Sequence, residues 1–162
     1  MKIGILSDTH GYLPPQVFKH LSEVDEIWHA GDVGSVDIIT QLQNFKPTRG
    51  VFGNIDGQDV RGYFPEYIFF NVANTPILIT HIGGYPPRYN SFSKPLIHHF
   101  APKLFVCGHS HILKIQYDAA FDCLHINPGA CGKQGWHKVQ TLVTLEVNNG
   151  KFSNAQVIEL AK

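Results

Sequence analysis

Short runs of apolar residues, bounded by glycines or polar residues, recur along the whole chain. In the first third, these runs predict three strands, at 3–6, 25–28 and 49–52. Pro14-Pro15 can open a helix that continues to about Leu21, because proline suits the first helical turn. Ser35 is the expected N-cap of a second helix, which continues to about Asn44. This alternation predicts parallel strands joined by right-handed crossovers.

In the second half of the chain, strand-like runs follow one another more closely. Segments 67–70 and 76–80 flank Ala73-Asn74-Thr75, which is typical of a hairpin turn, and a helix is expected at 94–100. Further strands are expected at 104–106, 112–118, 121–126, 139–147 and 155–160. Segment 83–91 is expected to be an irregular surface loop. Parallel units followed by hairpins predict an α/β fold with two sheets packed face to face and helices outside.

The composition is that of an ordinary globular protein, with 43% hydrophobic and 16% charged residues. At this length we expect one domain, covering residues 1–162. Lys+Arg and Asp+Glu both number 13, so no excess positive charge is available to hold a nucleic-acid backbone. We therefore expect no stable nucleic-acid partner. The near-zero net charge leaves a homo-oligomer open.

Features that would direct the chain to a membrane or an oxidising compartment are not evident in the sequence. No apolar run approaches the roughly 20 residues that a membrane span needs. The N-terminus leads within a few residues into Asp8, which leaves no room for a signal peptide before it. The three cysteines, Cys107, Cys123 and Cys131, form no Cys-x-x-Cys pair, so we expect no disulfide framework. These features predict a cytoplasmic protein.

Side chains that can bind metals stand just past five of the apolar runs: Asp8, His10, Asp32, Asn54, His81, His109 and His111. Open α/β sheets place their sites along the carboxyl ends of their strands, so these residues are expected to meet. Carboxylate, imidazole and amide ligands together suit Mn, Fe, Ni, Co or Zn rather than a thiolate site or an all-oxygen cage. Seven ligands are too many for one ion. They predict two divalent ions that share a bridging carboxylate, with Mn the first choice.

The order of these motifs resembles the calcineurin-like metallophosphoesterase superfamily. The matching segments are Asp8-Thr9-His10, Gly31-Asp32, Gly53-Asn54, His81 and Gly108-His109-Ser110-His111. Each motif alone is common, whereas five in this order, each after an apolar run, are specific. The short length and Asn127-Pro128-Gly129 are similar to its small bacterial and archaeal phosphodiesterase branch.

The resemblance implies a four-layer α/β/β/α sandwich of two mixed sheets, the metallo-dependent phosphatase fold. It places Asp8, His10 and His111 on one metal, Asn54, His81 and His109 on the other, and Asp32 between them as the bridge. It also implies hydrolysis of small phosphate esters by in-line attack of a metal-bridging hydroxide, with diesters as the expected substrate class. Asn54 would contact a phosphate oxygen as well as a metal. The catalytic residues are then Asp32 and Asn54.

Three alternatives stay open at this point. The same fold serves as a non-catalytic scaffold in the retromer subunit, and a scaffold or interaction module is the first alternative. A phosphomonoesterase or a nuclease using the same site are the others. Retention of all seven ligands favours catalysis, and the neutral net charge and Ile55 speak against the monoesterase and nuclease readings.

Two positions depart from the family pattern. Larger members carry His directly after the Gly-Asn motif, where this chain has Ile55, so proton transfer to the leaving group from that position is lost. Many branch members carry a second His where this chain has Gly83.

Four further residues have roles that the sequence does not decide. Asp56 is either a turn residue or an acceptor near His81 or Asn54, and Arg88 is either a solvated loop residue or a phosphate contact. His29 and His125 are the best candidates for outer hydrogen-bond partners of the ligands.

Overall fold

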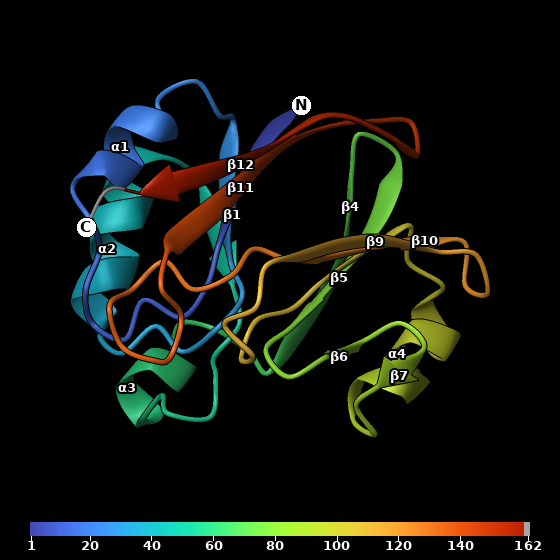
Figure 1. Cartoon of the computed structure of the whole chain (residues 1–162), viewed down its shortest axis with the longest axis horizontal. Helices are drawn as coiled ribbons and strands as arrows, with labels where there is room; N and C mark the ends of the chain where they lie inside the picture. Colours follow the sequence, from blue (N-terminus) through green and yellow to red (C-terminus); the bar gives the residue numbers. More distant parts are fainter. Residues whose placement is uncertain (161–162) are drawn as a thin grey trace.

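The structure is a computed structural model that describes residues 1–160. Its main feature is a pair of five-stranded mixed sheets packed face to face (Figure 1). The first sheet has the order β12-β11-β1-β2-β3, with β1 at Lys2–Leu6, β2 at Glu26–His29, β3 at Thr48–Gly50, β11 at Gln140–Asn148 and β12 at Lys151–Leu160. The second has the order β4-β5-β8-β10-β9, with β4 at Tyr67–Val72, β5 at Thr75–Thr80, β8 at Leu104–Val106, β9 at Lys114–Asp118 and β10 at Cys123–Asn127.

Helices cover the outer faces of both sheets, which completes the expected four-layer sandwich (Figure 1). The helices are α1 (Gln16–His20) and α2 (Val36–Phe45) on the first sheet, α4 (Ser93–Phe100) on the second, and α3 (Gln58–Arg61) after β3. Within residues 1–160, no helix is long and apolar enough to cross a membrane.

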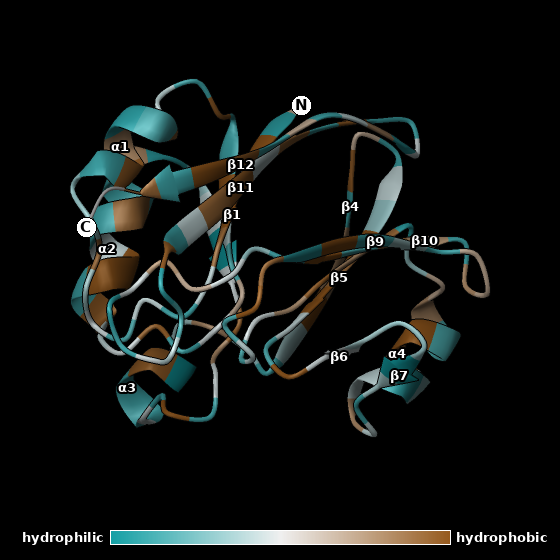
Figure 2. Cartoon of the chain, viewed as in Figure 1, coloured by the Kyte–Doolittle hydropathy of each residue, from teal (hydrophilic) through white to brown (hydrophobic). Residues whose placement is uncertain are grey.

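Alternation along the strands produces three apolar layers. Ile3 and Ile5 of β1 pack between the two sheets, whereas Leu6 packs on the side of α1 and α2. In β5, Ile77 packs between the sheets and Leu78 packs toward α4. Figure 2 shows hydrophobic residues along the strands of both sheets and in α2. Both faces of the central strands are therefore buried, as the continuous apolar runs predict.

Strand direction brings the predicted ligands to one edge of the sandwich. β1, β2 and β3 are parallel neighbours, as the alternating pattern of the first third predicts, and β5, β8 and β10 form a second parallel set. The loops that carry the ligands follow β1, β2, β3, β5 and β8. The two sheets together therefore supply one rim of loops at their carboxyl ends.

Several boundaries differ from the sequence prediction for local reasons. β3 ends at Gly50 because Phe52 leaves the sheet and donates its N–H to the Pro65 carbonyl, at 2.9 Å. β9 begins at Lys114 because the N–H of Ile112 bonds to Ser110 Oγ at 3.2 Å and prolongs the preceding loop. Ser35 stands at the N-cap of α2 but makes no side-chain cap hydrogen bond.

Three short elements were not expected, or were expected as something else. Segment 83–91 is not irregular throughout, because β6 (Gly84–Tyr85) and β7 (Arg88–Tyr89) form a two-stranded hairpin in it. Helix α3 has no counterpart in the prediction, and β12 begins at Lys151 rather than at residue 155. The hairpin predicted around Ala73 and Asn74 is confirmed, and both residues have positive φ, at 46° and 56°.

Candidate metal centre

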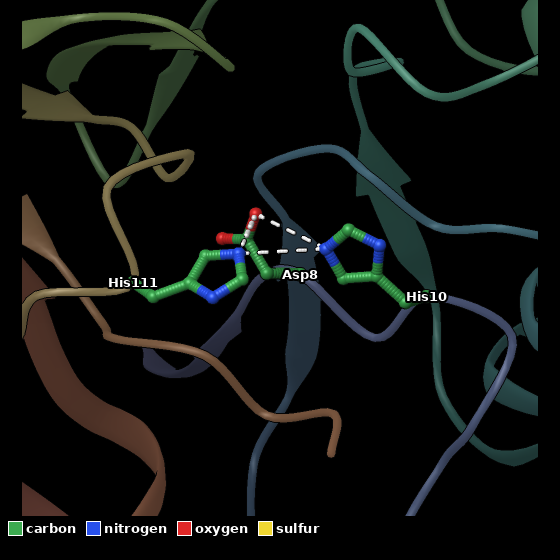
Figure 3. Close-up of side chains that lie close together, drawn as sticks. All are labelled: Asp8, His10 and His111. Carbon is green, nitrogen blue, oxygen red and sulfur yellow. Dashed lines mark hydrogen bonds and ion pairs between the residues drawn. The ribbon is translucent and has the colours of Figure 1, made fainter. Parts of the chain in front are cut away.

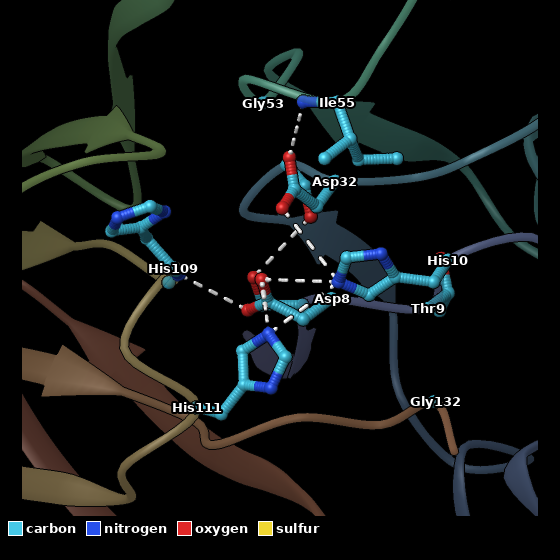
Figure 4. A network of polar contacts seen from close by, with 12 residues as sticks. Asp8, Thr9, His10, Asp32, Gly53, Ile55, His109, His111 and Gly132 are labelled. Atoms are coloured by element: carbon cyan, nitrogen blue, oxygen red, sulfur yellow. Dashed lines mark hydrogen bonds and ion pairs between the residues drawn. The ribbon is translucent and has the colours of Figure 1, made fainter. Parts of the chain in front are cut away.

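The loops at this rim bring all seven predicted ligands close together. Figure 4 shows Asp8, His10, Asp32 and His111 directed toward a common space, with His109 beside them. The remaining two ligands adjoin this space, because His81 Nε2 lies 3.2 Å from Asp32 Oδ1 and 3.1 Å from Asn54 Oδ1. Residues as far apart in the sequence as Asp8 and His111 thus share one site.

The first group of ligands consists of Asp8, His10 and His111 (Figure 3), whose ligand atoms all lie within 4.8 Å of one another. His111 Nε2 is 3.2 Å from Asp8 Oδ1 and 3.4 Å from His10 Nε2. Atoms that bind one tetrahedral ion at about 2.0–2.2 Å lie about 3.3–3.6 Å apart. The third pair, His10 Nε2 and Asp8 Oδ1, is slightly wider at 3.9 Å. The donor atoms of this group are therefore close to the spacing that one small divalent ion requires.

The second group consists of Asp32, His81 and His109, whose ligand atoms also lie within 4.8 Å of one another. Asp32 also reaches the first group, since its Oδ2 lies 3.6 Å from His10 Nε2 while its Oδ1 faces His81. The two oxygens of one carboxylate thus face different groups.

Asp8 provides a separate indication that a cation belongs here. Its side chain is fully buried, and its Oδ2 accepts the N–H of His109 at 3.1 Å. Its Oδ1 is buried without any hydrogen bond, although His111 Nε2 is near. A buried carboxylate oxygen without a partner is costly unless a cation satisfies it. The donor set and this oxygen fit a divalent metal.

The charges of the site favour the same conclusion. Burial would raise the pKa of Asp32, but the contact with His81 and the N–H of Ile55 outweigh burial and hold that pKa below its usual value. The pKa of His111 is raised by its contact with Asp8. The carboxylate of Asp32 is therefore negatively charged at neutral pH and attracts positive charge.

Two ligand imidazoles are oriented by hydrogen bonds on their far sides. His81 Nδ1 lies 2.7 Å from the Ala30 carbonyl, which can only accept, so Nδ1 carries the proton and Nε2 presents a lone pair to the site. His137 Nε2 donates to the Gly132 carbonyl at 2.8 Å, so its Nδ1 accepts from His111 Nδ1 at 3.3 Å. In the neutral imidazole, His111 Nε2 then carries the lone pair and faces Asp8, as a metal ligand must.

The sequence prediction missed His137 and placed His125 wrongly. His125 packs against the rings of Tyr89 and Phe105, and neither of its nitrogens has a hydrogen-bond partner, so it supports no ligand. His29 Nε2 does lie 2.9 Å from Thr9 Oγ1, between Asp8 and His10 in the chain, and its Nδ1 accepts the Gly31 N–H. His29 therefore braces the first ligand loop without touching a ligand side chain.

The ligand loops have an unusual backbone. Five of the seven ligands have positive φ: Asp8, His10, Asp32, His109 and His111, at 55°, 48°, 52°, 69° and 58°. Such a conformation costs about 1 kcal/mol or more for each residue other than glycine. Hydrogen bonds between loops hold it, including those from Asp8 N to Gly31 O and from His10 N to Asp32 O, both 3.0 Å. The fold maintains strain to aim these side chains inward.

Residues 1–150 match the family model of the calcineurin-like phosphoesterase superfamily domain. The chain belongs to this superfamily. A probable metallophosphoesterase of Methanothermobacter thermautotrophicus is 30% identical over 138 residues, which cover 80% of this chain and 77% of that protein. A phosphodiesterase of Methanocaldococcus jannaschii is 26% identical over 148 residues, covering 81% and 84%. Vps29 of Chaetomium thermophilum has a TM-score of 0.78 at 14% identity, covering 99% and 97%, which is a likeness of fold.

Membership of the calcineurin-like phosphoesterases implies use of divalent metal, and the two ligand groups are where this member can hold it. Thiolates are not part of the site. Cys107, which lies closest to the ligand loops in the chain, is buried, and burial raises the pKa of its thiol to about 12.

The two departures from the superfamily pattern have different structural settings. Ile55 is 47% exposed, and its backbone N–H holds Asp32 Oδ1 at 3.1 Å, so its side chain can vary without disturbing that contact. Gly83 is enclosed: a Cβ atom there would lie 2.7 Å from both Cys107 Cβ and Phe105 Cζ. A histidine does not fit at Gly83 unless these neighbours move.

Asp56 is a structural acceptor rather than a partner of His81 or Asn54. Its Oδ2 accepts the N–H groups of Val33 at 3.0 Å and Gly53 at 2.8 Å, and its Oδ1 accepts that of Gly34 at 2.8 Å. One carboxylate thereby ties the loop that carries Asp32 to the loop that carries Asn54. Asn127 does the same for the His109 loop, donating to Gly108 O at 2.8 Å and Ser110 Oγ at 3.0 Å.

Two cavities adjoin the ligands. One of about 370 Å³ contains Asn54 and His81 together with Phe52, Arg61, Glu66 and Phe92. The other, of about 360 Å³, contains His109, Gly83, Tyr85 and Arg88. Arg88 thus lies at the edge of the site. A larger cavity of about 700 Å³, near Lys103 and Tyr117, contains none of the predicted ligands.

Proposed function

We propose that this chain is a phosphodiesterase that holds two divalent metal ions and hydrolyses small phosphodiesters. The observation that carries the proposal is the pair of ligand groups with Asp32 between them, one carboxylate oxygen facing each. Asp8, His10 and His111 would hold one ion, and Asn54, His81 and His109 the other, with Asp32 as the bridge. Mn is the first choice, and the same ligands also suit Fe, Ni, Co or Zn.

The chain's own residues orient and balance the charges of the reaction. When bound, two divalent ions stabilise phosphate oxygens and lower the pKa of water toward about 7. Asp8 and Asp32 offset the positive charge of such a site from buried positions. The carbonyl oxygen of Asn54 faces His81 Nε2, so its NH₂ group is available to donate to a phosphate oxygen.

Two features of the site favour diesters over monoesters. Cavities of similar size lie beside Asn54 and beside His109, so each of the two arms of a diester has a space next to the ligands. The residue after Asn54 is Ile55, which cannot donate a proton to a poor leaving group. Small diesters with stable leaving groups match both features.

The proposal is tested by metal analysis of the purified protein together with hydrolysis assays. We expect two divalent ions per chain, loss of activity with a chelator and recovery with Mn²⁺. We expect bis(p-nitrophenyl) phosphate to be hydrolysed faster than p-nitrophenyl phosphate. Absence of both bound metal and hydrolysis would favour the scaffold alternative instead.

A further inference from the structure

The cavity beside Asn54 and His81 contains one arginine, Arg61, the last residue of α3. We call it the Arg61 cavity; Phe52, Glu66 and Phe92 are among its other lining residues. Asn54 and His81 are also proposed metal ligands. An ester arm that extends from the phosphorus on this side therefore enters the Arg61 cavity.

Arg61 is held in place on two sides. Its Nε donates to the Asp56 carbonyl at 2.8 Å, and its guanidinium carbon lies 4.3 Å from the centre of the Phe52 ring. The carboxylate of Asp56 is itself fixed by three backbone N–H groups of the ligand loops. The guanidinium is thus positioned by the same loops that carry Asp32 and Asn54.

The charge of Arg61 is not matched by a carboxylate. Among residues 1–160 the ion pairs of lysine and arginine side chains are Lys2–Glu23, Arg49–Glu26 and Lys103–Asp122. Arg49 shows the contrast, because it also covers an aromatic ring, that of Phe70, but pairs with Glu26. Arg61 keeps its terminal nitrogens for a ligand, and a planar fork of this kind binds carboxylate or phosphate through two parallel hydrogen bonds.

We propose that Arg61 selects diesters whose second arm carries an anionic group, a carboxylate or a phosphate, and binds that group in the Arg61 cavity. This inference rests on the proposed phosphodiesterase function. Glu66 lines the same cavity and opposes the effect, since its carboxylate repels an anionic arm. Arg61 and Glu66 are both exposed, so solvent and salt screen both charges. Arg61 differs in being held by two contacts, and its guanidinium can donate hydrogen bonds directly to an anionic arm.

The test compares p-nitrophenyl phosphodiesters with second arms of similar length: propyl, 2-carboxyethyl, 2-phosphoethyl and choline. We expect the unmodified protein to prefer an anionic arm over propyl by about tenfold in kcat/KM, mainly through KM, and to prefer choline least. Whichever anionic arm is preferred identifies the group. Arg61→Gln should abolish the preference, and Arg61→Lys should keep part of it, because lysine retains the charge without the fork.

Two further variants make the assignment specific. Arg88→Gln changes the arginine of the other cavity and should leave the ratio between arms unchanged, whereas Glu66→Gln should increase the preference for anions. A purely structural role for Arg61 would slow all esters alike at a constant ratio and would overturn the inference. So would loss of the preference in Arg88→Gln. Hydrolysis without arm selectivity would refute this inference alone, and absence of any metal-dependent hydrolysis would refute the proposed function.

Discussion

At the scale of single residues, the site depends on side chains that serve two partners at once. Asp32 directs one carboxylate oxygen to each ligand group, and Asp8 gives one oxygen to a backbone N–H and keeps the other free. Such residues cannot be replaced by others that satisfy only one partner.

Replacing Asp32 tests the bridge. We expect Asp32→Ala to lose both ions and to reduce turnover by more than the 10–100-fold that is usual for loss of an outer hydrogen-bond partner. Asp37→Ala, which removes an exposed carboxylate of α2, is the matched control and should retain both. Elemental analysis with a turnover assay decides the matter, and a fully loaded, active Asp32→Ala protein would refute the bridging role.

His137 gives a more selective prediction. His137 accepts a hydrogen bond from His111 Nδ1, and among residues 1–160 it forms no hydrogen bond with another predicted ligand. His137→Ala should therefore lower the affinity for the ion held by Asp8, His10 and His111 by about 10–100-fold, while the affinity for the other ion is unchanged. Metal titration of the two variants His137→Ala and His99→Ala measures this, His99 being an exposed residue of α4. An equal loss of affinity for both ions would contradict this prediction.

Ile55 determines how the reaction depends on the leaving group. With no proton donor beside Asn54, rates across substituted phenyl diesters should rise steeply as the pKa of the released phenol falls. Ile55→His keeps the backbone N–H that binds Asp32 and should flatten this dependence, because proton donation adds about 10²–10⁴ for poor leaving groups. Ile55→Val is the control. A flat dependence in the unmodified protein, with chemistry limiting the rate, would require another acid.

At the scale of elements, the ligand loops are coupled by hydrogen bonds rather than by apolar packing. Asp56 joins the loops after β2 and β3, and Asn127 of β10 joins the loop after β8. These contacts hold loops that contain residues of positive φ and would otherwise relax.

Asp56→Asn should therefore lower both stability and metal affinity. An amide places its NH₂ group opposite at least one backbone N–H, so at least one hydrogen bond is lost, at a cost of about 1–3 kcal/mol in the free energy of unfolding. Asp59→Asn, on the exposed side of α3, should change stability by less than about 0.5 kcal/mol. Urea denaturation of the two variants compares them, and equal stabilities would show that the Asp56 contacts are dispensable.

The elements that the sequence predicts well are those whose signal is local. Buried strands appear as apolar runs, and each of the seven candidate ligands follows such a run, so their meeting at one rim could be predicted. Helix α3 and the β6–β7 hairpin were missed because elements of four and two residues form through tertiary contacts. The role of His137 could not be predicted either, because no periodic pattern marks a residue 26 positions from its partner His111.

At the scale of the whole molecule, the site exists only when the two sheets are packed. The first sheet supplies Asp8, Asp32 and Asn54 from its loops, and the second supplies His81, His109 and His111. The apolar layer between the sheets contains residues of β1 and β2 as well as of β5 and β8. Packing of that layer sets the distance between the two halves of the site, which joins the stability of the fold to metal binding.

Buried histidines also make the stability of the whole molecule depend on pH. Burial, with a smaller effect of Lys114, lowers the pKa of His125 to about 4, and burial lowers that of His29 to about 4 as well. Between about pH 6.5 and 4, the unfolded chain therefore binds protons that the folded chain does not. The free energy of unfolding must fall as the pH falls through this window, and no such loss arises from these groups above pH 6.5.

His125 is the better residue for testing this, because neither of its nitrogens has a hydrogen-bond partner, whereas both nitrogens of His29 do. Leucine has a similar volume and suits contact with the ring of Phe105. His125→Leu should raise the free energy of unfolding by about 1–3 kcal/mol at pH 7.5 by removing unpaired polar atoms. This gain should grow as the pH falls from 6.5 to 4. His29 should still make the free energy of unfolding of the variant depend on pH.

Urea denaturation at pH 7.5, 5.5 and 4.5, with the exposed His20→Leu as control, measures both effects. A gain that stays constant with pH would show that the pKa of His125 is the same in the folded and unfolded chains. A loss of stability at pH 7.5 would show that its nitrogens have a partner such as a buried water.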